Sequence, residues 1–442
     1  MRAVSVRITI GLALALFLGL GVRDIAQSNR GLFAEAEYFA EVRIQSVLGA
    51  ARYEEVTMFF EDAGAQLAMF EPPRGVYLGA YIASDTAVNG DMVRFEQMMG
   101  RHSIFKYRLE LARDPDLPPG ELVSPPGELV PHETIFRHAV RGRTPLFALE
   151  YAGAISDDEF AEISRVLARG FGYYFSPAFV QPPKPVRGQD AAAYVARFTV
   201  MRDAFRRYAP HVAFVYAVDI ADADVAEQFY PGEAADWVGV RALASLSPYR
   251  AFKGDMLAAI EQVYHTFQAS KPMFVHIGIS RQSGHDFIYR PHLAAAEMER
   301  VYNALLADFP RVKGIVYLSV DEVRRGAARN TADDFSITDD EVLRAAYREM
   351  VSRPDVVAAV AANDTPEDGG VRKRSRHAAL RAGGLYYISE RTLLDEMGIP
   401  RGSLRGRPRT NGGIRFYPAA ALVQSNEWSL QAHGAHIVLE PS

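Results

Sequence analysis

The sequence predicts an α/β protein built around a (β/α)8 TIM barrel, and three observations favour that fold. Between residues 75 and 357, short apolar runs alternate with amphipathic helical segments. Such alternation is typical of parallel βα units, and the eight runs match the number of strands that closes this barrel. The span of 75–357 is also close to the usual size of the fold.

The eight apolar runs are, in chain order, GVYLGAYI, SIFKYRLEL, PLFALEYAG, GYYFSPAFV, VAFVYAVDI, DWVGVRAL, PMFVHIGIS and GIVYLSVDE. Between them lie stretches such as DDEFAEISRVLARG, AAYVARFTVMRDAFRRYA and AAAEMERVYNALLADF, whose apolar residues recur at helical spacing. The hexapeptide PPGELV occurs twice, at 118–123 and 125–130. Its prolines and glycines predict a surface loop there.

The N-terminus has the pattern of an export signal. Arg2 and Arg7 precede the apolar run ITIGLALALFLGLGV. A basic flank before about 15 apolar residues is typical of a signal peptide and is short for a spanning helix. No small-x-small cleavage site follows, so residues 1–26 are expected to be a signal peptide or an uncleaved membrane anchor. We therefore expect a periplasmic protein, or one anchored in the inner membrane and facing the periplasm. A buried N-terminal helix is the competing interpretation.

Two further segments flank the predicted barrel. Residues 27–74 have apolar positions at three-to-four spacing, which predicts a helical lead-in. Residues 358–376 are interpreted as a linker. Residues 371–417 hold eleven Lys and Arg against three acidic residues, a local charge of 11 − 3 = +8 in a chain of net charge −5. This asymmetry predicts a separate basic module over 377–442.

Composition excludes several kinds of chemistry. The 442 residues include no cysteine, which excludes disulfides, thiolate catalysis and cysteine-based zinc sites. His285, Asp286 and His292 lack the spacing of metal ligands, so we expect no metal site, and we expect no cofactor.

Four stretches carry a resemblance to a known family. GVYLGAYI followed by VRFEQMMGRHSIFKYR has the form of a strand, a helix and a second strand, and FYPGEAADWVGV leads through a turn and an Asp-Trp pair into another strand. RVKGIVYLSVDE and DFSITDDEVLRAAYREM have the form of a last strand and a closing helix. In this order they resemble the catalytic barrel of glycoside hydrolase family 26, the β-mannanase-like hydrolases. The resemblance implies a retaining mechanism with two carboxyl groups about 5 Å apart.

Both catalytic acids of that family are absent where the resemblance places them. The family's proton donor ends its fourth strand, where this chain has Val180. Its nucleophile ends the seventh strand, where His276 and Ile277 precede Gly278. No Asp or Glu lies between 172 and 189, so an alignment shift of one residue does not restore the donor. The resemblance therefore implies a barrel that has lost the family's hydrolytic pair.

Other predicted strand ends still carry ionisable groups. Glu150, Asp219 and Asp321 end the third, fifth and eighth runs, and His276 ends the seventh. The carboxyl ends of barrel strands converge on one face. Glu150 with Asp219, or Asp219 with Asp321, are thus candidates for a relocated acid/base pair, and His276 for a base. The competing interpretation is that these acids cap helices or pair with nearby arginines.

Aromatic residues near the same strands are candidate saccharide-binding residues, because flat rings stack on sugar faces. They are Tyr81, Tyr151, Tyr174, Phe179, Tyr216 and Trp237. The competing interpretation is packing in the barrel core, which is the favoured one for Trp237.

The basic module carries a second, local resemblance. Residues 385–423, LYYISERTLLDEMGIPRGSLRGRPRTNGGIRFYPAAALV, resemble the winged helix-turn-helix of the MerR and excisionase type. The resemblance implies phosphate binding. An export signal would separate the module from chromosomal DNA, so we expect no nucleic acid. An anionic polysaccharide, lipid head groups or a partner protein are the expected ligands, and packing against the acidic barrel is the alternative.

The sequence thus predicts an exported, glycoside-hydrolase-like barrel that binds carbohydrate in polysaccharide assembly or processing, as a pseudoenzyme. One alternative is an active glycosidase or lyase that acts on a β-linked polysaccharide through relocated acids. Another is a scaffold or regulatory protein that binds an anionic partner through the C-terminal module.

Overall fold

The computed structural model describes residues 54–62, 66–82, 85–111, 142–151, 155–245, 255–283, 286–321, 333–360, 371–375, 379–382, 385–406, 408–411, 414–423, 428–433 and 436–441. The predicted signal or anchor at 1–26 and the repeated hexapeptide lie outside these residues. Within them, no helix combines the length and the apolar character that a membrane crossing requires.

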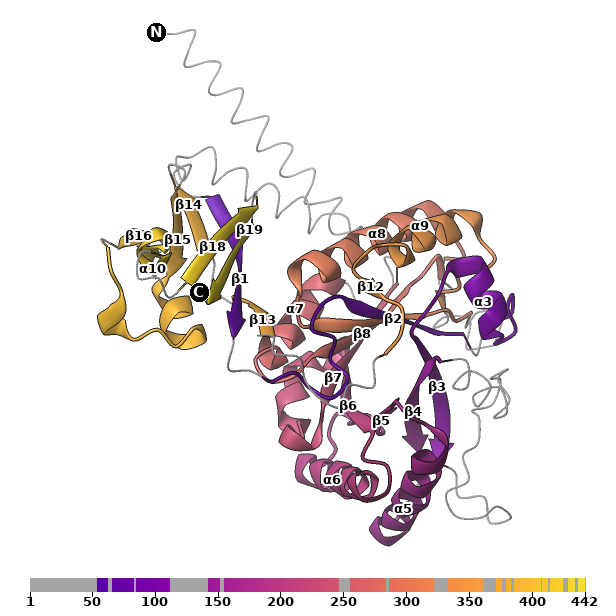
Figure 1. The fold of residues 1–442 in the computed structure, drawn as a ribbon. Helices are drawn as coiled ribbons and strands as arrows, with labels where there is room; N and C mark the ends of the chain where they lie inside the picture. The colour runs from indigo at the N-terminus through magenta and orange to yellow at the C-terminus, as the bar shows by residue number, and fades with distance from the viewer. Residues whose placement is uncertain are drawn as a thin grey trace, which may run out of the picture.

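Eight parallel strands close into a barrel, which confirms the predicted fold (Figure 1). They are β2 (Val76–Tyr81), β3 (Ile104–Leu111), β4 (Thr144–Tyr151), β5 (Ala178–Gln181), β6 (Val212–Asp219), β7 (Trp237–Ala244), β8 (Met273–Ile279) and β10 (Val312–Leu318). Each strand pairs with the next, and β10 pairs in parallel with β2 from Gly314–Tyr77 to Leu318–Tyr81, which closes the ring.

Helices surround the barrel, as the alternating pattern predicts (Figure 1). They are α3 (Met92–Met99), α5 (Asp157–Tyr174), α6 (Ala191–Tyr208), α7 (Met256–Phe267), α8 (Pro291–Asp308) and α9 (Glu341–Val351), with the 3₁₀ segments η1 (Ile220–Phe229) and η2 (Gly232–Ala234) between β6 and β7. Their N-termini are well specified. Ser156 and Glu159 form a capping box on α5, and Asp91 and Asp190 accept backbone N–H bonds at the starts of α3 and α6.

The interior of the barrel near its amino end is filled by aromatic rings. Phe179 of β5 lies 5.5 Å from Trp237 of β7 and 5.0 Å from Phe274 of β8, between ring centroids. Phe70, which precedes β2, packs edge-on against Phe179. The Trp237 indole N–H donates to the carbonyl of Met69 at 2.7 Å. These contacts between different strands form a packed core of the kind that fills such barrels.

The stretch GYYFSPAFV was expected to be one strand, and the structure corrects this. Strand β5 covers only Ala178–Gln181, and Gly172–Tyr174 is the last turn of α5. Phe171 and Phe175 pack on Phe147 of β4 and so anchor the helix end to the barrel. Helical packing thus overrides the strand preference of the paired tyrosines.

The C-terminal module is a β-sheet that includes a strand from the other end of the chain. Its strands are β1 (Glu54–Asp62), β13 (Val371–Arg374), β14 (Ala379–Ala382), β15 (Leu385–Ser389), β16 (Arg409–Asn411), β17 (Ile414–Pro418), β18 (Trp428–His433) and β19 (His436–Pro441). Strand β1 pairs in parallel with β19 and antiparallel with β13 and β14. Figure 1 shows β1 among the yellow strands of this module.

Two predictions about the flanking segments are therefore wrong. Residues 54–62, expected in a helical lead-in, form β1, because alternate residues Val56, Met58 and Phe60 are buried against Ile437 and Leu439 of β19. Residues 371–374, expected in the linker, form β13.

The described residues of 385–423 form strands β15, β16 and β17 with short helical segments between and after them, and do not show a helix-turn-helix. Their helical segments are the π-helical η3 (Thr392–Glu396), the 3₁₀ η4 (Arg401–Ser403) and α10 (Ala419–Val423), each of five residues or fewer. A helix-turn-helix needs two complete helices, one of which enters the groove of DNA.

The barrel region also has three strands of two residues each, β9 (Gln282–Ser283), β11 (Asp333–Asp334) and β12 (Val356–Val357).

Candidate functional site at the carboxyl ends of the strands

Five charged side chains gather at the carboxyl ends of consecutive barrel strands. Arg108 lies on β3, Glu150 on β4, Lys184 follows β5, Asp219 ends β6 and Arg241 lies on β7. We call these five side chains the charged ring. Side chains two residues apart on a strand share a face. Arg241 therefore shares its face of β7 with the core residue Trp237, which directs the ring toward the barrel axis.

The ring is built from bidentate ion pairs. Arg108 donates from Nε and Nη2 to the two oxygens of Glu150, at 3.1 and 2.6 Å. Arg241 donates in the same way to Asp219, at 2.7 and 2.8 Å. Lys184 adds a third bond to Asp219 at 2.7 Å. Bidentate pairs fix the planes of both partners, so the ring presents donors and acceptors in set positions.

Both carboxylates of the ring are held in the ionised form. Burial by itself would raise the pKa of Glu150, but the hydrogen bonds and charge of Arg108, with Lys184 and Lys106, lower it below its ordinary value. Burial likewise opposes ionisation of Asp219, and Arg241 and Lys184 bring its pKa below the ordinary value. The alternative interpretation, that these acids pair with nearby arginines, is thus confirmed for both. Neither has the raised pKa of a proton donor.

Beneath the ring lies a second polar layer that the sequence analysis did not identify as a unit. Lys106 of β3 is buried, and its Nζ donates to Oε1 of Gln181 on β5 at 3.4 Å. The same Nζ lies 3.4 Å from Nδ1 of His276 on β8. One signal was available in the sequence: Lys106 interrupts the apolar run SIFKYRLEL two residues before Arg108.

Burial and nearby cations favour the neutral form of both bases in this layer. Burial, with the charges of Arg241, Lys184 and Arg108, lowers the pKa of Lys106 to about 7. Burial and the same cationic surroundings hold the pKa of His276 well below its ordinary value. The Nε2 atom of His276 is buried and has no hydrogen-bond partner in the described part of the chain. A Cβ placed on Gly239 of β7 would lie 3.4 Å from it.

Strand β5 carries the position at which the resemblance predicts the family's proton donor. Val180 is fully buried, and it alternates along β5 with Phe179 and Gln181, which face the interior. The inward-facing residue at the carboxyl end of β5 is therefore Gln181. Its amide cannot take the part of a carboxylic acid.

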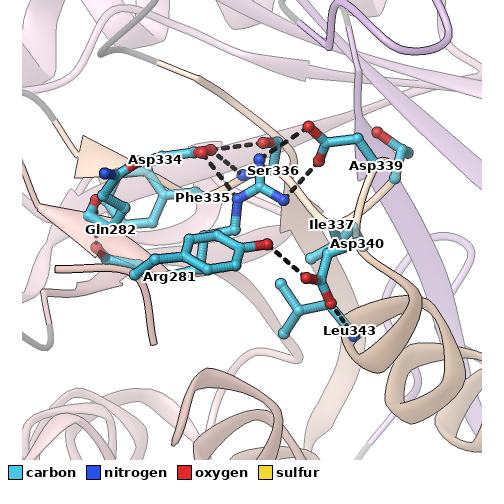
Figure 2. Close-up of polar contacts among 12 residues, drawn as sticks. Arg281, Gln282, Asp334, Phe335, Ser336, Ile337, Asp339, Asp340 and Leu343 are labelled. Atoms are coloured by element: carbon cyan, nitrogen blue, oxygen red, sulfur yellow. Dashed lines mark hydrogen bonds and ion pairs between the residues drawn. The ribbon is translucent and has the colours of Figure 1, made fainter. Parts of the chain in front are cut away.

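Asp321 belongs to a different part of the barrel mouth. It is buried and forms an isolated bridge with Asp334, which pairs with the buried Arg281 at 2.8 Å. Figure 2 shows Arg281 between Asp334 and Asp339, and its ion pair with Asp339 completes a clamp from the end of β8 to the segment before α9. Asp85 ties the end of β2 to the same region.

Asp85 is itself held by hydroxyl groups from two other segments. It is buried and accepts hydrogen bonds from Ser319 at 2.7 Å and Thr338 at 2.7 Å. Burial raises its pKa above the ordinary value. Together with the Arg281 clamp, this arrangement fixes the loops that follow β2, β8 and β10 and gives Asp85 and Asp334 a structural role.

Four of the aromatic candidates are core residues. Tyr81, Phe179, Tyr216 and Trp237 are all 3% exposed or less. Tyr216 faces the helices, since its hydroxyl donates to the carbonyl of Ala226 in η1 at 2.6 Å. Because buried rings present no face to a sugar, the prediction of saccharide binding is wrong for Tyr81, Phe179 and Tyr216. For Trp237, the favoured interpretation of core packing is confirmed.

The other two aromatic candidates have different outcomes. Tyr174 is 59% exposed, but it ends α5, where the chain approaches the amino end of β5 and not the charged ring. The side chain of Tyr151 lies outside the described residues.

Among the side chains that the structure describes, no three His, Asp or Glu gather as a metal site would require.

Comparisons with known proteins give only distant likenesses. No family profile and no curated protein matches the chain. A GH26 β-mannanase from Bacteroides ovatus aligns at 11% identity over 67% of this chain and 94% of its own, with a TM-score of 0.47. A GH113 β-1,4-mannanase aligns at 11% identity over 63% and 99%, with a TM-score of 0.43. A glucosidase from Croceicoccus marinus aligns at 11% identity over 87% and 83%, with a TM-score of 0.43.

Proposed function

We propose that the barrel binds carbohydrate at the charged ring and serves polysaccharide assembly or processing. The observation that carries this proposal is the pair of bidentate contacts, Arg108 with Glu150 and Arg241 with Asp219, at the strand ends where barrels of this kind hold ligands. Fixed guanidinium donors beside fixed carboxylate acceptors suit the hydroxyl groups of a sugar, each of which both donates and accepts.

We further propose that the site does not hydrolyse glycosides by the two-carboxyl mechanism. That mechanism needs one protonated and one ionised carboxyl group on either side of the scissile bond. Glu150 and Asp219 both have lowered pKa values. Strand β5 ends at Gln181, and neither β5 nor β8, which carries His276, contains an Asp or Glu. A glycosidase that uses Glu150 and Asp219 is the second candidate, which is favoured by the partial exposure of both side chains, 38% and 23%.

Binding and turnover can be measured on one protein preparation. The intact chain is titrated with neutral and acidic oligosaccharides, and the mixtures are then analysed for shortened or unsaturated products. We expect binding that Arg108→Gln weakens at least about tenfold, as for loss of a charged hydrogen-bonding group. Asp222→Asn, in an exposed pair with Arg187, is the matched control and should leave binding unchanged. Turnover that Glu150→Gln or Asp219→Asn abolishes would establish the second candidate instead.

The remaining proposals concern location and the basic module. The pattern of residues 1–26 supports export. Fractionation of cells that express either the tagged chain or a form without these residues would test it.

For the basic module, two contacts favour the interpretation that it packs on the barrel. Arg374 pairs with Glu261 of α7 at 3.0 Å, and His436 lies 3.4 Å from Asp308 of α8. A chain of residues 66–360, which lacks β1 together with the rest of the module, and which keeps full saccharide binding would separate this role from ligand binding by the module.

A further inference from the structure

The charged ring and the layer beneath it contain more positive than negative groups. Their cationic side chains are Lys106, Arg108, Lys184 and Arg241, and their carboxylates are Glu150 and Asp219. With Lys106 protonated, the balance is 4 − 2 = +2. Because these groups lie at one end of the barrel and are partly shielded from water, their excess positive charge acts on a ligand that binds there.

Lys106 is the cation without a carboxylate. In the part of the chain that the structure describes, its Nζ contacts only the neutral amide of Gln181 and the imidazole of His276. The side chain is buried, with 7% of its surface exposed. A buried ammonium without a counter-charge is costly, and the group responds by giving up its proton.

The other cations are arranged so that a ligand can share them. Asp219 accepts from both Arg241 and Lys184, so either cation can turn toward a bound anion while the other still neutralises Asp219. Arg241 is 42% exposed and Lys184 is 28% exposed, so both are reachable from solvent. The buried Nε2 of His276, which has no hydrogen-bond partner among the described residues, lies in the same interior and adds an unsatisfied polar group.

We propose that the ligand of this site is an acidic saccharide, whose carboxylate is bound by Arg241 while Lys184 still neutralises Asp219, and that Lys106 takes up one proton from solvent as the ligand binds. This inference rests on the proposed function and adds to it the charge of the sugar. A guanidinium fork matches a carboxylate in shape as well as in charge, which favours an acidic sugar over a neutral one.

The proton balance follows from the groups around Lys106. Arg108, Lys184 and Arg241 disfavour its charged form, Glu150 favours it, and His276 beside it is neutral. With a pKa of about 7, only about one tenth of the Lys106 side chains carry the proton at pH 8. A bound carboxylate offsets the cations, so Lys106 becomes protonated in the complex. Near pH 6 the group is already charged, and little uptake is expected.

The test is calorimetric titration of the intact chain in buffers of different ionisation enthalpy, at pH 6 and pH 8. The probes are short oligomers of galacturonate, mannuronate and glucuronate, with neutral manno- and gluco-oligosaccharides of equal length. We expect at least one acidic probe to bind ten or more times tighter than any neutral one, as for one added charged contact. We expect proton uptake approaching one per ligand at pH 8, and an affinity that falls as the pH rises.

Variants assign the proton to one residue. Lys106→Met keeps most of the length of the side chain but not the charge, and it should abolish the uptake at pH 8. Lys313→Met is the matched control, because Lys313 is also buried and has a pKa lowered to about 8. Lys313 lies at the amino end of β10, away from the charged ring, and donates to the carbonyl of Pro73. The control should leave the uptake unchanged. Thermal unfolding of both variants confirms that they are folded when titrated.

Each other outcome overturns a defined part of the inference. Neutral and acidic probes of equal affinity would overturn the acidic ligand and leave carbohydrate binding standing. Acidic binding with the same proton uptake in Lys106→Met would overturn the role of Lys106. Inorganic sulfate that displaces the acidic probe at comparable concentration would show an anion site without sugar recognition. No binding of any probe would remove the proposed function itself.

Discussion

The Nζ atom of Lys106 lies 3.4 Å from Nδ1 of His276, and both side chains are buried inside the barrel. Two basic groups at this distance cannot both be charged without strong repulsion. Burial and the surrounding cations hold the pKa of His276 well below its ordinary value, whereas Lys106 titrates near neutrality. Lys106 is therefore the group of this pair that responds to pH in the physiological range.

The first prediction is that His276 titrates well below 6.5, the ordinary value for histidine, because burial and the nearby cations lower its pKa. The nitrogen chemical shifts of the labelled imidazole, measured by NMR on the intact chain over a range of pH, report its protonation state. Lys106→Met removes one of the charges that disfavour the imidazolium, so the midpoint of His276 should rise in that variant. A wild-type midpoint close to the ordinary value would contradict the buried geometry.

The second prediction concerns the contribution of Asp219 to stability. Because its pKa is lower in the folded than in the unfolded chain, its contribution is present above about pH 4 and is lost as the pH falls through the folded value. Asp219→Asn should cost about 2 kcal/mol of unfolding free energy at pH 7, as for breaking a largely buried pair. Urea unfolding at pH 7 and below pH 3 measures the difference, which should shrink at low pH.

Asp222→Asn is the control for this measurement. Asp222 lies three residues further along the chain and pairs with Arg187, whose side chain is 55% exposed. An exposed pair of this kind contributes less than about 1 kcal/mol. Equal losses in the two variants at pH 7 would show that the ring does not hold Asp219 as described.

The third prediction tests the joining of the chain ends in the C-terminal module. Phe60 of β1 is 3% exposed and packs in one cluster with Ile388, Ile437 and Leu439. Phe60→Ala should destabilise the module by about 3–5 kcal/mol, as for loss of a buried aromatic side chain. Limited proteolysis should then cleave within 371–442 before it cleaves the barrel. Leu385→Ala, at a position 55% exposed, is the control and should leave the cleavage order unchanged.

The contrast between barrel and module shows what the sequence could predict. In the barrel, most strands are apolar runs buried on both faces, such as Val212–Val218, and most are followed by a helical segment, so local pattern and fold agree. In the module, β1 pairs with β19, whose residues lie more than 370 positions away. The sequence of residues 54–62 does not indicate this partner strand, and the apolar residues there fit a helical spacing as well as an alternating one.

The candidate site was predictable only in part for a similar reason. Glu150 and Asp219 were predicted because strand ends of a barrel converge, but their partners Arg108, Lys184 and Arg241 come from neighbouring strands and loops. Which acid meets which cation depends on strand register, which the sequence does not specify. The same limit explains the aromatic candidates, because one residue of register decides whether a ring such as Tyr216 faces the axis or the helices.

The last prediction separates two glycines on one helix. Gly170 and Gly172 both lie in the last turns of α5. A Cβ on Gly172 would lie 2.1 Å from the backbone carbonyl oxygen of Tyr208, at the end of α6, whereas a Cβ on Gly170 would meet nothing within 4 Å. Gly172→Ala must therefore push the ends of α5 and α6 apart and should cost about 2 kcal/mol or more. Gly170→Ala should stabilise the protein by up to about 1 kcal/mol, because alanine favours the helix. Thermal unfolding of the two variants gives the comparison, and changes of the same sign would mean that GYYF does not pack as the end of a helix.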